Sequence, residues 1–124
     1  MDAMQVGEKL VELCRQGENV QAVATLYDKD IVSVEAMSGP DMPAETRGVD
    51  AVRQKNEWWI ENHGVHSVNI QGPFPHGDRF AVLYEYDITP KAGPMKDQRT
   101  KMQEIAVYEV RNGKIVREEF FYRT

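Results

Sequence analysis

Apolar residues recur at helical spacing through the first part of the chain. They predict an amphipathic helix whose buried face consists of Val6, Leu10, Leu13 and Cys14. Asp2 suits the N-cap of this helix, and Gly17 suits the left-handed residue beyond its end. A second, shorter helix is predicted from a cap at Asn19 to the polar turn at residues 28–30, with an inward face of Val20, Val23, Ala24 and Tyr27. The two helices therefore form a hairpin.

Residues 31–64 contain a predicted strand, a loop and a third helix. Ile31 to Ala36 is apolar and rich in β-branched side chains, which favours a strand. The segment 38–43 holds two prolines and a glycine, and it belongs to a loop of about a dozen residues, a length at which loops are often functional. Helical spacing then predicts a third helix that Gly64 stops, with one side made of Val49, Val52, Trp59, Ile60 and His63.

The second half of the chain alternates between apolar and polar residues, which indicates strands. The predicted strands are Val65 to Ile70, Phe80 to Thr89, Arg99 to Arg111 and Lys114 to Tyr122. They are separated by a turn at Gly72 to Gly77, a loop at Pro90 to Gln98 and the Asn112-Gly113 turn. Helices followed by a run of strands are typical of an α+β fold, in which helices cover one face of an antiparallel sheet. A sheet curved around three helices leaves a hollow that suits a small-molecule pocket.

Composition narrows the class of protein. The 124 residues are 41% hydrophobic and 28% charged, which suits one globular domain, residues 1–124, with one hydrophobic core. The formal net charge is −5, and the basic residues are scattered among acids, whereas nucleic-acid binders usually carry a basic patch. We therefore expect no nucleic-acid partner.

Cysteine usage and the absence of targeting signals favour a cytoplasmic location. Cys14 is the only cysteine, which excludes an internal disulfide and fits a reducing compartment. The N-terminal segment MDAMQVGEKL lacks a signal-peptide pattern, and no apolar run approaches the ~20 residues of a membrane span, so we expect no membrane partner. Neither a Gly-rich phosphate loop nor a nucleophile elbow is present, so no cofactor is implied.

One acid lies inside the apolar segment 31–36. Glu35 is unusual there because an ionised carboxylate on a buried strand is costly unless it is paired, hydrated or used in chemistry. Glu35 is therefore the first candidate for a functional residue.

A family resemblance rests on the order of the elements and on three segments of the chain. The LYDKDIVSVE segment, the following RGVDAV and the final NGKIVREEFFY are similar to the nuclear transport factor 2-like superfamily, and within it to SnoaL-like and ketosteroid-isomerase-related proteins. The resemblance covers essentially the whole chain. It implies a cone-shaped, curved antiparallel sheet on three N-terminal helices that encloses a pocket, and often a homodimer through the outer sheet face. Isomerases, polyketide cyclases and non-catalytic binding domains share this fold, so the fold alone does not fix the activity.

The resemblance also assigns individual positions. It places Glu35 where ketosteroid isomerases have their general-base aspartate. Their oxyanion-hole tyrosine and protonated aspartate would correspond to Leu10 and Ala106, neither of which can donate a hydrogen bond. Since one such donor is typically worth ~3 kcal/mol, the sequence argues against steroid isomerisation.

A second acid offers a different pairing. Glu104 lies two residues before Ala106 and so, by strand alternation, on the same face. The hypothesis is that Glu35 and Glu104 are catalytic, one protonated and one ionised, and move a proton on a small hydrophobic carbonyl compound, as in an isomerase, cyclase or lyase. The alternative is that arginines such as Arg53 or Arg99 neutralise both acids in a non-catalytic ligand-binding or dimerisation domain.

Several further side chains are predicted to bind the ligand. They are Trp58, Trp59, His63, Tyr84, Tyr86, Met102, Tyr108, Phe120 and Tyr122. Trp59 aligns with Val52 and is the predicted core residue, whereas Trp58 suits the pocket rim or plain packing. The three histidines fall at a helix end, a strand start and a turn, a spacing that does not suggest a metal site.

The last predicted strand carries an aromatic ring on each face. Phe121 shares one face with Arg117, Glu119 and Arg123, which suits a partly polar dimer interface better than bare surface. Single exposed aromatic residues are also common, so plain exposure is the alternative.

Overall fold

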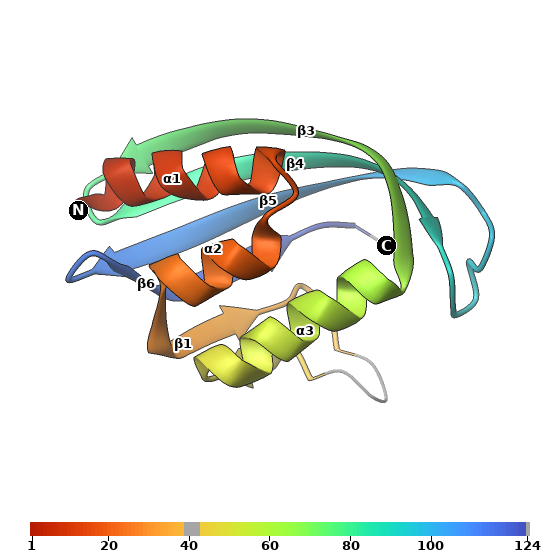
Figure 1. Cartoon of the computed structure of the whole chain (residues 1–124), viewed down its shortest axis with the longest axis horizontal. Coiled ribbons are helices and arrows are strands. Elements are labelled where there is room, and N and C mark those ends of the chain that lie inside the picture. Colours follow the sequence, from red (N-terminus) through yellow and green to blue (C-terminus); the bar gives the residue numbers. More distant parts are fainter. Residues whose placement is uncertain (39–42, 124) are drawn as a thin grey trace.

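The structure is a computed structural model that describes residues 1–38 and 43–123. Two helices, α1 (Ala3–Arg15) and α2 (Asn19–Leu26), lead into β1 (Tyr27–Val34), the short β2 (Glu45–Arg47) and α3 (Val49–Glu61). Four long strands follow: β3 (His63–His76), β4 (Arg79–Pro90), β5 (Thr100–Arg111) and β6 (Lys114–Phe121). Figure 1 shows the three helices side by side across the concave face of the strands.

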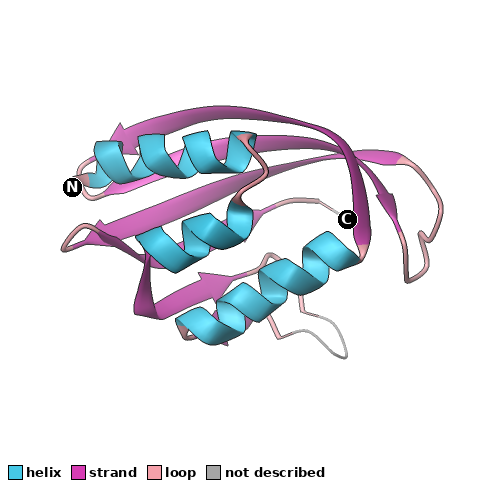
Figure 2. Cartoon of the chain, viewed as in Figure 1, coloured by secondary structure: helices cyan, strands magenta, loops and turns pink. Residues whose placement is uncertain are grey.

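All six strands form one sheet with the order β2-β1-β6-β5-β4-β3. Strands β3 to β6 are a continuous antiparallel meander, as the sequence predicts, and β1 pairs with β6 in parallel. The sheet curves around the helices, which all cover the same face (Figure 2). The α+β architecture with a curved, mostly antiparallel sheet on three helices is therefore confirmed.

The first helix begins where the sequence predicts. The Asp2 carboxylate accepts a hydrogen bond from the Gln5 backbone N–H at 2.9 Å, and the Gln5 side chain accepts one from the Asp2 N–H at 3.0 Å. This reciprocal capping box satisfies two backbone donors that the first turn leaves free. The helix then buries Val6, Leu10 and Cys14 against the sheet.

Close packing of α1 on the sheet depends on Gly7. A Cβ atom at this position would lie 2.8 Å from Pro73 Cβ and 3.1 Å from Phe80 Cδ2, so α1 or β3 would have to move. We expect Gly7→Ala to lower the free energy of unfolding by ~1–3 kcal/mol, because overpacking outweighs the gain in helix propensity. Urea unfolding measures this, with Glu8→Ala on the exposed side of the same helix as the control. An equally stable Gly7→Ala variant would contradict the packing described.

Three local predictions are wrong for a common reason. Tyr27 is the first residue of β1 and not part of α2, and residues 28–30 continue the strand instead of turning. The predicted turn at Gly72 to Gly77 belongs largely to β3, where a register shift between Gln71 and Phe74 accommodates the prolines. The predicted loop before α3 contains β2, while its residues 39–42 lie outside the described part of the chain. In each case pairing with a neighbouring strand overrides local turn propensity.

The core lies between the helices and the inner face of the sheet. Its most deeply buried side chains are Val6, Leu10, Ile31, Val52, Phe80, Val82, Ala106, Tyr108 and Ile115. None of the helices within residues 1–38 and 43–123 is long and apolar enough to cross a membrane.

Candidate functional site

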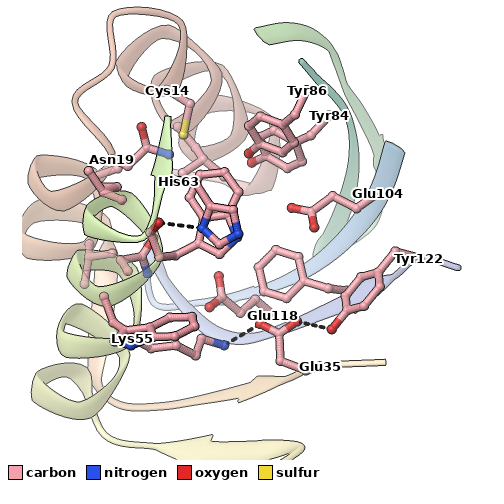
Figure 3. Close-up of a pocket in the computed structure, with 18 of the residues that line it drawn as sticks. Cys14, Asn19, Glu35, Lys55, His63, Tyr84, Tyr86, Glu104, Glu118 and Tyr122 are labelled. Atoms are coloured by element: carbon pink, nitrogen blue, oxygen red, sulfur yellow. Dashed lines mark hydrogen bonds and ion pairs between the residues drawn. The ribbon is translucent and has the colours of Figure 1, made fainter. Parts of the chain in front are cut away.

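A cavity of about 370 Å³ lies between the inner face of the sheet and the helices α2 and α3. Figure 3 shows side chains from both layers pointing into it. The structure brings all eleven candidate residues to its lining: Glu35, Trp58, Trp59, His63, Tyr84, Tyr86, Met102, Glu104, Tyr108, Phe120 and Tyr122. A cavity of this size, with aromatic walls and a few polar groups, suits a small-molecule ligand.

The aromatic wall of the cavity is centred on Trp59. Its ring stacks on His63 at a centroid distance of 4.4 Å and lies 5.3 Å from the Tyr86 ring. His63 is fixed in turn, because its Nδ1–H donates to the Trp59 carbonyl at 2.8 Å. Trp59 is only half-buried, so its prediction as a core residue is wrong: α3 lies over the cavity and buries Val52 alone. Trp58 is 46% exposed at the rim.

Glu35 follows the end of β1, and both of its carboxylate oxygens have partners. Lys55 Nζ lies 2.8 Å from Oε1, and the Tyr122 hydroxyl donates to Oε2 at 2.9 Å (Figure 3). The arginines proposed to neutralise the acids lie elsewhere, since Arg53 pairs with Asp50 and Glu57 and Arg99 pairs with Asp87. Glu35 is thus ion-paired with a lysine and not with an arginine.

Lys55 is a site residue that sequence reasoning missed. It lies three residues after the buried Val52 and four before Trp59, so helical spacing does place it on the inward side of α3. Its ammonium also donates to Ser33 Oγ at 2.6 Å and lies 5.4 Å from the centre of the Phe120 ring. Lys55 therefore links Glu35 to a second group of polar residues on β1.

That second group surrounds Glu118, a carboxylate that is only 1% exposed. Ser33 donates to one carboxylate oxygen at 2.7 Å, and the Tyr27 hydroxyl donates to the other. Burial raises the pKa of Glu118, while the hydrogen bonds from Tyr27 and Ser33 and the charge of Lys55 oppose that rise. By strand alternation Glu118 shares a face with Phe120 and Tyr122, but it was not among the residues that the sequence predicted for the site.

Glu104 lies on β5 opposite Tyr84 and faces the cavity (Figure 3). Desolvation raises the pKa of Glu104 to about 8, and the negative charges of Glu35 and Glu118 add to the rise, while Lys55 opposes it. No hydrogen bond from a described residue contributes to the raised pKa of Glu104. The cavity thus places Glu104, whose raised pKa favours the protonated carboxyl, near Glu35, which is paired with Lys55.

Hydroxyl groups occupy the most buried part of the lining. The hydroxyls of Tyr84 and Tyr108 lie 2.7 Å apart, and burial raises the pKa of both, so they keep their protons. Leu10 and Ala106, which the resemblance matched to the oxyanion-hole positions of ketosteroid isomerases, are both buried apolar residues. In the described part of the chain, tyrosines on the strands supply buried hydroxyl groups to the inner cavity.

Within residues 1–38 and 43–123, no three His, Cys, Asp or Glu side chains are arranged to hold a metal ion. His66 lies outside the cavity lining and hydrogen-bonds to Thr89 Oγ1 at 2.7 Å.

The curved sheet, the three helices and the enclosed cavity define the class of protein, and comparisons identify the family. The SnoaL-like domain model matches residues 1–122, and the chain belongs to this family. A candidate SnoaL-like polyketide cyclase from Mesorhizobium loti is 42% identical, with a TM-score of 0.90 over 98% of this chain and 100% of that one. No curated protein sequence matches the chain.

More distant structures share the fold. An NTF2-like protein from Burkholderia thailandensis is 18% identical, with a TM-score of 0.79 over 99% of this chain and 92% of that one. A candidate polyketide cyclase from Pseudomonas putida is 15% identical, with a TM-score of 0.73 over the same shares. The name of the Mesorhizobium protein also carries the term carbohydrate phosphatase, so names alone do not fix a reaction.

Proposed function

We propose that this protein catalyses proton transfer on a small, mainly apolar carbonyl compound, as an isomerase, cyclase or lyase. Glu104 is the group that gains and loses the proton, and Glu35 is the group that stays ionised. The observation that carries the proposal is the Glu104 carboxyl, which faces the cavity with a pKa of about 8. A general acid or base works best when its pKa lies near the working pH.

The chemistry balances without a cofactor. A pKa of about 8 leaves a minor fraction of Glu104 ionised at pH 7, with its proton released to water. This ionised form takes a proton from the carbon beside the ligand carbonyl, and the electrons of that C–H bond form a C=C bond. The carbonyl π electrons move onto oxygen to give an enolate. Glu104 then returns its proton to another atom of the same molecule, so no oxidant or reductant is consumed.

Glu35 has a different role from Glu104 because Lys55 and Tyr122 already occupy its two oxygens. Its fixed negative charge helps to keep Glu104 protonated in the resting protein. Negative charge in the cavity would oppose formation of an enolate. The positive charge of Lys55 reduces that net negative charge.

Deuterium exchange tests the proposed reaction. A ligand that copurifies with the protein is identified by mass spectrometry and returned to the protein in D₂O, together with a panel of enolisable aryl ketones. The proposal expects deuterium to enter at the carbon beside the carbonyl faster than in buffer alone. Binding of these compounds with no exchange above the buffer rate would refute catalysis.

A non-catalytic ligand-binding domain is the alternative function, and one observation favours it. The Glu35–Lys55 pair is largely buried, with side-chain exposures of 18% and 14%, and it resembles a structural ion pair. A binding domain would hold the same ligand in both wild-type protein and Glu104→Gln, and would leave it chemically unchanged.

We also infer that the protein forms a homodimer through the outer face of the sheet. Ile105 and Phe121 are neighbours in the β5–β6 register and are 47% and 49% exposed. Beside them, Glu85 accepts hydrogen bonds from the side-chain amides of Asn69, Gln71 and Gln103. An apolar centre with a polar surround is typical of a protein interface.

Light scattering tests the dimer. Wild-type protein at micromolar concentration is expected to give twice the monomer mass, and Phe121→Asp is expected to give the monomer mass, because a charge at the centre of the interface is costly. Met4→Asp is the matched control, since Met4 is exposed on α1, which covers the opposite face of the sheet. A monomeric wild-type protein would contradict the inference.

Two further expectations from the sequence are also proposals. We infer a cytoplasmic location because the only cysteine, Cys14, is buried and its thiol pKa is raised to about 11, as suits a structural thiol in a reducing compartment.

We also infer that residues 1–124 fold as one domain. Limited proteolysis that releases a stable shorter fragment would oppose this inference.

A further inference from the structure

The cavity has a second polar region beyond Glu104, at its most buried end. It is formed by side chains that line the cavity and are each less than a tenth exposed: Cys14, Tyr27, Tyr84, Tyr108 and Glu118. These residues come from α1, β1, β4, β5 and β6, so every layer around the inner cavity contributes. The proton-transfer step proposed above uses none of them.

Most hydrogen-bond donors at this end are already used. The Tyr27 and Ser33 hydroxyls both donate to Glu118. One of the Tyr84 and Tyr108 hydroxyls donates to the other, so the pair has at most one O–H left for a ligand.

Acceptors at the same end remain available. Each Glu118 oxygen accepts one of these hydrogen bonds and has lone-pair capacity for another, and the Tyr27, Tyr84 and Tyr108 oxygens can each accept as well. The buried end is therefore rich in acceptors and poor in free donors. It complements a ligand group that brings its own donor.

We propose that the buried end of the cavity binds a hydroxyl group of the ligand, which donates to an oxygen of the Tyr84–Tyr108 pair. A carbonyl oxygen brings no donor and would leave the acceptors unmatched. An ammonium group would have to lose its hydration at a site where Lys55, through Ser33, already supports Glu118. A neutral hydroxyl satisfies the acceptors at the lowest desolvation cost.

The substrate class becomes more specific as a result. Glu104 and Tyr108 lie on the same face of β5, four residues apart, so the reactive carbonyl and the hydroxyl belong to different ends of one molecule. The carbonyl in this substrate class rests on the proposed function, whereas the hydroxyl site does not. The ligand is thus a hydroxylated, mainly apolar carbonyl compound, with the hydroxyl end inserted first.

Binding of two matched probes tests the proposal without any turnover. 2-Naphthol and 2-methylnaphthalene have nearly the same shape, but only the first carries a hydroxyl. Their dissociation constants are measured by quenching of Trp58 and Trp59 fluorescence in wild-type protein, Tyr84→Phe/Tyr108→Phe, Tyr108→Phe and Thr25→Val. Thr25→Val is the control, because it removes an exposed hydroxyl that donates to the Gln21 carbonyl and lies outside the cavity lining.

The preference for the hydroxyl probe is expected to fall about tenfold in the double variant and less in Tyr108→Phe, where the Tyr84 oxygen remains, and to stay unchanged in Thr25→Val. A fall of this size corresponds to about 1.4 kcal/mol, the value of one hydrogen bond. An unchanged preference in the folded double variant would overturn the proposal, as would failure of wild-type protein to bind 2-naphthol. Failure of deuterium exchange would instead count against Glu104 chemistry and leave this binding result untouched.

Discussion

Replacing Glu104 with glutamine is expected to slow proton exchange on the ligand by 10²- to 10⁴-fold, the usual contribution of a general acid or base. Glutamine has nearly the same shape and hydrogen-bonding reach, but it cannot gain and lose the proton at neutral pH. The cavity should therefore still bind the ligand. The measurement is the initial rate of deuterium uptake in D₂O at pH 7 and 25 °C.

The control for this variant is Glu119→Gln on β6. Glu119 follows Glu118 in the chain but pairs with Arg117 and does not line the cavity. It should exchange at the wild-type rate. A Glu104→Gln variant that keeps the wild-type rate would remove Glu104 from the mechanism.

The same Glu104→Gln variant is expected to be more stable than wild type at high pH. The pKa of Glu104 is about 8 in the folded protein and the ordinary pKa of glutamate is 4.5, so folding favours the protonated form. The stability that Glu104 contributes is complete below pH 4.5 and is lost as the pH rises through 8, because the unfolded chain ionises first. Glutamine does not ionise, so it avoids this loss.

Urea unfolding at two pH values measures the effect. At pH 4 the variant and the wild type should have similar stability, and at pH 9 the variant should be more stable by on the order of 2–4 kcal/mol, after allowance for water in the cavity. Glu119→Gln should show no such pH-dependent difference. A gain in stability with a loss of activity is typical of residues kept for function. An equal difference at both pH values would mean that Glu104 ionises normally.

Much of the fold could be predicted from the sequence because its local signals agree. Asp2 and Gln5 form the expected start of α1, and the alternating residues of β4 and β5 do face the core. The start of β1 at Tyr27 could not be predicted, because it depends on parallel pairing with Ile115, far away in the chain. Local propensity does not contain that information.

The candidate site, too, could be predicted only in part from the sequence. Strand alternation was enough to place Glu104, Tyr108 and Tyr122 toward one cavity. It could not show that Glu118 lies beside Ser33, because those residues are 85 positions apart and meet only through the β1–β6 register. The Lys55 ion pair depends on how α3 crosses the end of β1, which is a tertiary property.

The pKa of Glu104 is the most direct test of the central claim. Protein labelled with ¹³C in the glutamate carboxyl groups can be titrated by NMR, and comparison with Glu104→Gln assigns the signal. We expect a single titration midpoint near 8 for Glu104 in wild-type protein, and a lower midpoint in Glu35→Gln, which removes a neighbouring negative charge. A midpoint near 4.5, unaffected by Glu35→Gln, would contradict the claim that the cavity holds Glu104 as a protonated acid.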